Sequence, residues 1–120
     1  MTWKTGSETD TTFYEVLQKI KLHHKNKGQI FVGTDSLVNG SCCTFITSIV
    51  LLGAAGQKGG KFFYNKEKYN EPTRFYNRIL REVEKSINLA IRITEVCPNV
   101  NLEIHIDVSF FLLLNLIPEY

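Results

Sequence analysis

Three carboxylates occupy positions from which they can reach a common site. Asp35 ends an apolar stretch that begins at Gln29, Glu82 interrupts the apolar side of a long helical pattern, and Asp107 ends an alternating stretch. Carboxylates that lie close together repel one another unless cations hold them. Two Mg²⁺ or Mn²⁺ ions about 4 Å apart satisfy such a cluster and cleave phosphodiester bonds without a nucleophilic side chain. We therefore expect Asp35, Glu82 and Asp107 to be metal ligands and catalytic residues.

Two neighbouring side chains are candidates for auxiliary roles. Ser36 follows Asp35 and can orient a carboxylate or contact a phosphate, although a hydroxyl at this point also suits a turn. His105 can shuttle a proton to or from the site, although a strand histidine with a structural role is the simpler interpretation. On the helical pattern, Glu84 falls at the polar margin and is the alternative to Glu82.

The stretch that carries Asp35 is typical of a buried strand. It is apolar and β-branched over residues 29–37, and a Gly and an Asn bound it. Side chains alternate along a strand, so Asp35 shares one face with Phe31 and Gly33, and the other face carries Ile30, Val32 and Thr34. A carboxylate at the end of a buried strand is unfavourable unless backbone N–H groups, a cation or a metal compensate its charge.

The remaining pattern predicts the elements that must position these residues. Thr12 fits an N-cap, with Glu15 three residues on, and an apolar stripe follows it. The Asn39-Gly40 pair predicts a tight hairpin turn. We expect residues 1–10 to be loose, and we expect a helix at 12–24, strands at 29–37, 43–52 and 61–65, a charged loop at 66–72, a helix at 73–96 and a strand at 101–108.

The order of these elements predicts where the carboxylates meet. The strand at 101–108 follows a long helix, and a right-handed crossover would lay it parallel to the strand at 29–37. The C-terminal ends of the two strands would then lie together, with Asp107 next to Asp35. The fold class is therefore α/β, with a three-stranded antiparallel meander, a crossover helix, a fourth parallel strand and an extra N-terminal helix.

Composition narrows the class of protein. A chain of 120 residues with 43% hydrophobic residues is sufficient for one domain with a core. The net charge of +2 permits nucleic-acid binding without arguing for it. The odd number of cysteines, without CxxC spacing, predicts free thiols in a reducing cytoplasm. We expect no signal peptide and no membrane span, and a loop at 53–60 that is not a phosphate-binding loop.

The chain resembles the ribonuclease H-like fold and, more closely, the ribonuclease H-like YkuK family of bacterial proteins. The residues that carry the resemblance are Val32–Ser36, Gly59–Tyr64, Arg81–Ala90 and Glu103–Val108. The family is inferred from its fold to be nuclease-like. The resemblance implies metal-binding roles for Asp35, Glu82 and Asp107, and RNA, DNA or a hybrid as the partner.

The sequence departs from the family directly after Asp107. An apolar run, Phe110–Leu114, stands where relatives carry an Asn-Pro-rich segment and further elements. The acidic residue that a later helix usually adds to such a site has no clear counterpart. We expect a truncated, frame-shifted or divergent member, and the alternative function is a catalytically inactive remnant or binding module. The apolar tail can pack against the sheet or a second copy, and the oligomeric state stays open.

Overall fold

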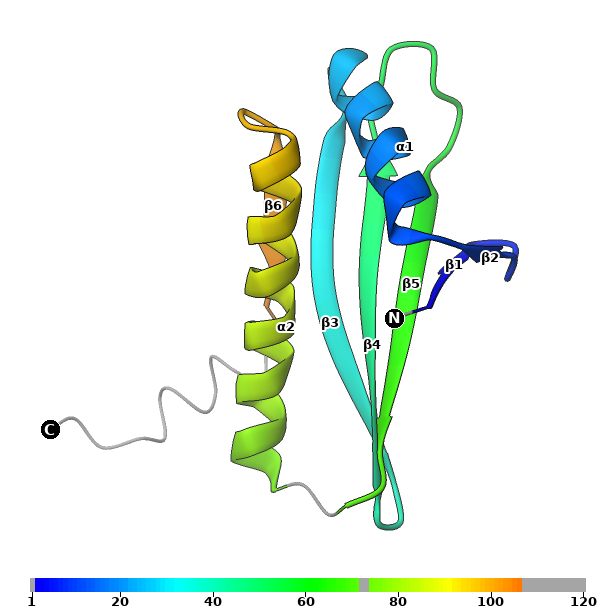
Figure 1. The fold of residues 1–120 in the computed structure, drawn as a ribbon. Coiled ribbons are helices and arrows are strands. Elements are labelled where there is room, and N and C mark those ends of the chain that lie inside the picture. The colour runs from blue at the N-terminus through cyan, green and yellow to red at the C-terminus, as the bar shows by residue number, and fades with distance from the viewer. Residues whose placement is uncertain (1, 72–73, 107–120) are drawn as a thin grey trace, which may run out of the picture.

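The computed structural model describes residues 2–71 and 74–106 of the chain (Figure 1). Its helices and strands are, in order, β1 (Trp3–Thr5), β2 (Asp10–Thr11), α1 (Phe13–Lys25), β3 (Gln29–Asn39), β4 (Cys42–Leu52), β5 (Lys61–Tyr69), α2 (Phe75–Val96) and β6 (Leu102–His105). The mixed α/β character predicted from the sequence is confirmed.

One mixed sheet contains all six strands, in the order β2-β1-β5-β4-β3-β6. Strands β3, β4 and β5 form an antiparallel meander, and the β3–β4 hairpin turns at Gly40, whose φ is 63°. Glycine adopts this left-handed conformation without a steric penalty. After the α2 crossover, β6 pairs with β3 in parallel, from Ile30–Leu102 to Gly33–His105.

The prediction that residues 1–10 are loose was wrong. Strand β1 pairs with β5, and β2 pairs with β1, so the N-terminal segment extends the sheet. Trp3 is only 1% exposed and packs 5.7 Å from the Phe13 ring. The buried Trp3 side chain and the pairing of β1 with β5 together hold this segment on the sheet. One isolated apolar residue leaves no periodic pattern from which a strand can be predicted.

The prediction of a short third strand followed by a charged loop was also wrong. Strand β5 continues to Tyr69, and its pairing with β4 extends to the Cys43–Tyr69 pair. Charged residues are tolerated here because β5 keeps a partner strand along its length, and because Glu67 meets a lysine of α2. The loop at 53–60 lies between β4 and β5 and is followed by a strand, as predicted.

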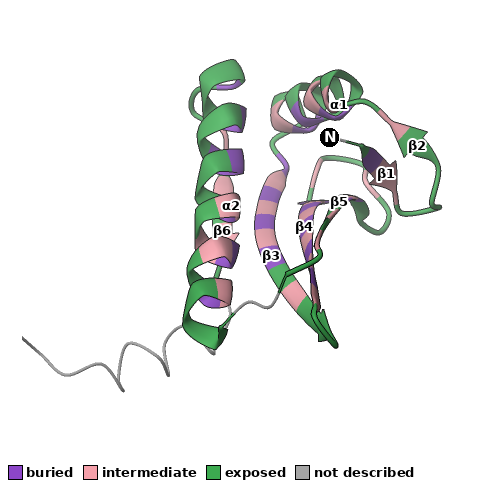
Figure 2. Cartoon of the chain, turned by 60° about the horizontal axis from the view of Figure 1, so that its bottom comes forward, coloured by how far each residue is buried: buried purple, intermediate pink, exposed green. Residues whose placement is uncertain are grey.

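Both helices lie on one face of the sheet, and the hydrophobic core lies between the helices and that face (Figures 1 and 2). The core residues are Trp3, Val16, Ile20, Ile30, Val32, Ile49, Leu51, Phe63, Leu89 and Ile93. Burial alternates along β3 and β4 with period two, so the predicted division of β3 into two faces is confirmed. We call the other face of the sheet the open face, since no described helix covers it.

Within residues 2–71 and 74–106, neither helix is long and apolar enough to span a membrane. The cysteines are free thiols, with Cys43 and Cys97 buried and Cys42 half-buried.

Candidate functional site

The carboxyl-terminal half of β3 presents three polar side chains in succession. Thr34 is buried against α2, Asp35 is exposed on the open face, and Ser36 is half-buried on the α2 side. The alternation follows from the strand geometry, which sends neighbouring side chains to opposite faces. The site is therefore divided by the sheet, with hydroxyls on one side and a carboxylate on the other.

Glu82 lies on the inward side of α2, as its position in the helical pattern predicts. Only 4% of its surface is exposed. Its Oε2 atom accepts a hydrogen bond of 3.0 Å from the hydroxyl of Ser36. Removing a carboxylate from water is strongly unfavourable without compensating polar partners, so its burial indicates a defined role for this side chain. Glu84, the alternative, is exposed.

A row of hydroxyl groups continues the site across the interface between helix and sheet. Ser86 lies one helical turn beyond Glu82, and its Oγ is 2.8 Å from Oγ1 of Thr34. Thr34 also donates to Thr47, its cross-strand neighbour on β4, over 3.3 Å. Sequence reasoning did not single out Ser86, although its i+4 spacing from Glu82 places both on the same side of the helix.

The side chains of Asp35 and Glu82 lie on opposite faces of the sheet, and Ser36 forms a hydrogen bond with each of them. The backbone N–H of Ser36 donates to Oδ1 of Asp35 over 2.8 Å, while its hydroxyl donates to Glu82. Both carboxylates are thus bound to the same residue. The structure brings together Ser36 and Glu82 directly, and Asp35 joins them through the Ser36 backbone.

On the open face, Asp35 and His105 line one shallow hollow of about 520 Å³, with Phe31, Gly33 and Ile106 among its other walls. The His105 ring meets Phe31 edge-on, with the ring centroids 5.1 Å apart. The two titratable groups of the hollow therefore share a face that solvent reaches.

Asp107 lies outside the described residues. The last described pair of the β3–β6 ladder is Gly33–His105, and Asp35 and Asp107 follow these residues two positions later in the sequence. In the described part of the chain, no group of three or more His, Cys, Asp or Glu side chains is placed to hold a metal ion. The three-carboxylate site stays a prediction.

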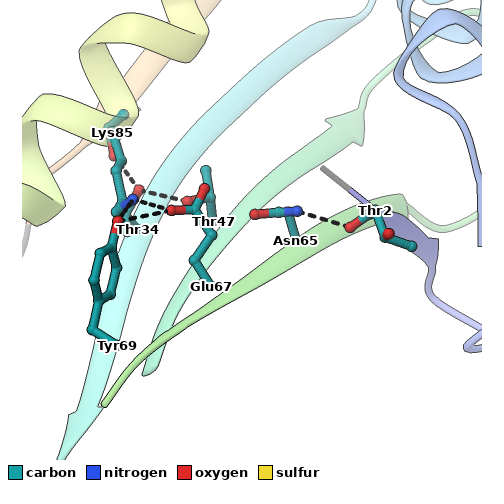
Figure 3. Close-up of polar contacts among 8 residues, drawn as sticks. Thr2, Thr34, Thr47, Asn65, Glu67, Tyr69 and Lys85 are labelled. Atoms are coloured by element: carbon teal, nitrogen blue, oxygen red, sulfur yellow. Dashed lines mark hydrogen bonds and ion pairs between the residues drawn. The ribbon is translucent and has the colours of Figure 1, made fainter. Parts of the chain in front are cut away.

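A second polar cluster occupies the same helix-facing side of the sheet, where Lys85 of α2 meets strand β5 (Figure 3). Lys85 forms an ion pair with Glu67 and donates to the hydroxyl of Tyr69 over 3.1 Å, and that hydroxyl donates to Glu67 over 3.1 Å. Sequence reasoning missed this cluster because residues 66–72 were expected to form a loop. Strand alternation places Glu67 and Tyr69 on one face once β5 is extended.

The protonation of this cluster is fixed by its internal contacts. Burial by itself would raise the pKa of Glu67, but the hydrogen bond and positive charge of Lys85 outweigh it and hold that pKa below its usual range. Burial by itself would lower the pKa of Lys85, but the hydrogen bonds to Glu67 and Tyr69 outweigh it, so the pKa is raised. Both groups are therefore charged at neutral pH.

Comparison with protein families agrees with this arrangement of strands and helices. The model of a family described as ribonuclease H-like matches residues 11–110. The chain belongs to the ribonuclease H-like YkuK family. The match includes β3, α2 and β6, which carry the candidate site. No curated protein and no solved structure gives a significant match.

The donor atoms of the site suit a hard divalent cation. Carboxylates and hydroxyls offer only oxygen, which Mg²⁺ and Mn²⁺ prefer. The carboxylate of Glu82 is buried between α2 and the sheet, and its Oε2 accepts a hydrogen bond from Ser36, so its orientation is fixed. The described residues supply two carboxylates, Asp35 and Glu82, and these lie on opposite faces of the sheet. The described part of the site therefore matches a divalent cation in the type of donor atom, but it does not bring both carboxylates to one point.

Proposed function

We propose that this ribonuclease H-like protein is a metal-dependent nuclease that hydrolyses phosphodiester bonds in RNA, DNA or a hybrid. In this proposal Asp35, Glu82 and Asp107 hold two divalent ions, Mg²⁺ or Mn²⁺. When bound, such ions activate a water molecule and stabilise the leaving oxygen. The observation that carries the proposal is that Ser36 hydrogen-bonds the carboxylates of both Asp35 and Glu82.

Each residue has a distinct task in this proposal. Glu82 is held in a fixed orientation by the Ser36 hydroxyl and by its burial between α2 and the sheet. Ser36 is a positioning residue, because it acts through the two carboxylates that it binds. Asp35 is exposed on the open face, where a phosphate can approach it. In this proposal His105, which lines the same hollow as Asp35, has the auxiliary role of passing a proton to solvent.

The open face also offers groups that suit a nucleic acid. Phe62 and Tyr64 project from it as a stacked pair, 6.2 Å between centroids, and Lys66 lies over the Tyr64 ring at 5.8 Å. Bases stack on exposed aromatic rings, and lysine attracts the phosphate backbone. Phe63 is excluded from this role, because it is 2% exposed and belongs to the core.

The test is manganese-dependent cleavage of labelled RNA, DNA and hybrid substrates by the wild-type chain and by Asp35→Asn. Substitution by Asn removes the charge and preserves the shape of the side chain. The matched control is Glu84→Gln, which makes the equivalent change at an exposed position on α2. We expect cleavage by the wild type and by Glu84→Gln, and loss of cleavage in Asp35→Asn.

Two results would overturn the proposal. One is cleavage that persists in Asp35→Asn or does not require the metal ion. The other is a wild-type chain that is folded by circular dichroism and cleaves none of the substrates.

A further inference from the structure

Helix α2 carries a second apolar stripe beside the one that faces the core. It consists of Tyr76, Leu80, Val83, Ile87 and Ile91, and we call it the outer stripe. These residues recur every three or four positions, so they form one side of the helix. At about 100° per residue, the outer stripe lies about 110° around the helix from the buried one. The buried stripe comprises Ile79, Glu82, Ser86, Leu89, Ala90 and Ile93.

The outer stripe is open to solvent. Tyr76, Leu80, Ile87 and Ile91 are 40–50% exposed, and Val83 is half-buried. In the cartoon of Figure 2, most residues on the side of α2 that turns away from the sheet are coloured as exposed. A surface helix normally carries polar residues on such a side, and a continuous exposed apolar patch marks a contact surface.

The described chain leaves the sheet beside this stripe. Ile106, the residue after β6 at which the description ends, is 37% exposed. It lines one small hollow together with Val83, which lies in the middle of the outer stripe. The sequence then continues into Phe110–Leu114, and residues 110–117 contain no charged side chain.

We propose that residues 110–117 pack against the outer stripe of the same chain. Residues 107–109 can span about 10 Å, and the stripe from Tyr76 to Ile91 is about 22 Å long, so the segment reaches it from Ile106. A tethered segment acts at an effective concentration in the millimolar range, which favours it over a second copy of the chain.

The open face of the sheet is the competing surface near Ile106. That face also carries Asp35, His105 and Lys66, whose burial under an uncharged segment would be unfavourable. The outer stripe has no charged member, so the observations favour the helix.

Photo-crosslinking tests the proposal in the full chain. Benzoylphenylalanine is placed at Ile87 on the outer stripe, at Ile46 on the open face, and at Leu22, which is exposed on α1. Trypsin then separates peptide 86–92 from peptide 93–120, which contains residues 110–117 and no internal cleavage site. Crosslinking is carried out on a mixture of isotopically light and heavy chains.

We expect the probe at Ile87 to link to residues 110–117 in products that are wholly light or wholly heavy. Mixed light–heavy products would overturn the proposal and assign the stripe to a second copy. A link from Ile46 to residues 110–117, or no link from Ile87 to them, would overturn it too. The probe at Leu22 should give no link to this segment.

A second measurement does not depend on the probe. Chymotrypsin cleaves after Phe110 and Phe111, and packing of the segment should slow this cleavage. We expect the cleavage to be about tenfold faster in Ile87→Asp than in Leu22→Asp, which makes the same change on α1. Equal rates in the two variants would contradict the packing. Neither readout requires catalytic activity, so this result and that of the nuclease test are independent.

Discussion

Replacing Lys85 by Met tests whether the cluster of Glu67, Tyr69 and Lys85 stabilises the fold. Methionine keeps much of the apolar stem but removes the ammonium group. The side chains of Lys85 and Glu67 are 18% and 29% exposed, so water replaces the lost contacts only in part. The variant loses the ion pair to Glu67 and the hydrogen bond to Tyr69, and it leaves a half-buried carboxylate with one fewer partner.

The expected magnitude follows from these contacts. Hydrogen bonds to charged groups contribute about 1.5–3 kcal/mol each when buried, and partial solvent exposure reduces that figure. The hydrogen bond from Tyr69 to Glu67 remains in the variant. We expect Lys85→Met to lower the free energy of unfolding by about 2 kcal/mol.

Urea unfolding measures this change through the fluorescence of Trp3, the single tryptophan, which is 1% exposed in the folded chain. The matched control is Lys4→Met, because Lys4 also pairs with a carboxylate, that of Asp10 at 2.9 Å, but in an exposed position. Exposed ion pairs contribute little to stability, so the control should unfold at the wild-type urea concentration.

The reasoning is refuted if Lys85→Met shifts the unfolding midpoint no more than Lys4→Met does. A double variant adds a further check. When Glu67→Leu is combined with Lys85→Met, the half-buried carboxylate that has lost its lysine is removed as well, so the double variant should be more stable than Lys85→Met alone.

Three other changes have defined outcomes. The pKa of Glu67 is lowered in the folded chain, so the ionised carboxylate contributes to stability above its ordinary pKa of 4.5. This contribution is lost as the pH falls through the pKa of the folded chain. The urea midpoint, measured from pH 6 to pH 2, should therefore fall less in Glu67→Gln than in the wild type. Manganese should raise the melting temperature of the wild type and of Glu84→Gln but not that of Glu82→Gln, because Glu82 belongs to the proposed metal site and Glu84 does not. An equal rise in the two variants would exclude Glu82 as a metal ligand. Gly28→Ala should lower the free energy of unfolding by about 2 kcal/mol in the same urea assay, because the Cβ atom of the new alanine would lie 2.1 Å from the His23 ring. A urea midpoint within error of that of the wild type would contradict this prediction.

Local patterns were sufficient to predict several features of this protein. The β3 strand divides into two faces because side chains alternate with period two, and this holds wherever the strand lies. Glu82 was placed on the inward side of α2 by the helical repeat of 3.6 residues alone. Thr12 was predicted as an N-cap, and its Oγ1 accepts from the backbone N–H of Glu15 over 3.1 Å.

The same patterns failed where stabilisation comes from distant partners. Strand β1 is ordered because Trp3 packs into a hydrophobic core that consists mainly of residues from other elements. The charged end of β5 is ordered because Lys85, from a helix, meets Glu67. Neither contact can be recognised from the amino-acid composition of residues 1–10 or 66–72, because the partner residues lie elsewhere in the sequence. Neither could therefore be predicted without the fold.

The sequence by itself determined which side chains share a face of β3, which side of α2 is apolar and the order of the elements from α1 to β6. Only the tertiary structure decided that both helices cover the face of Thr34 and Ser36, while Asp35 stays on the open face. The reason is physical: periodicity divides a strand into two faces, but the packing of the whole core selects the face that is buried. Because of that choice, Ser36 rather than Asp35 contacts Glu82 directly.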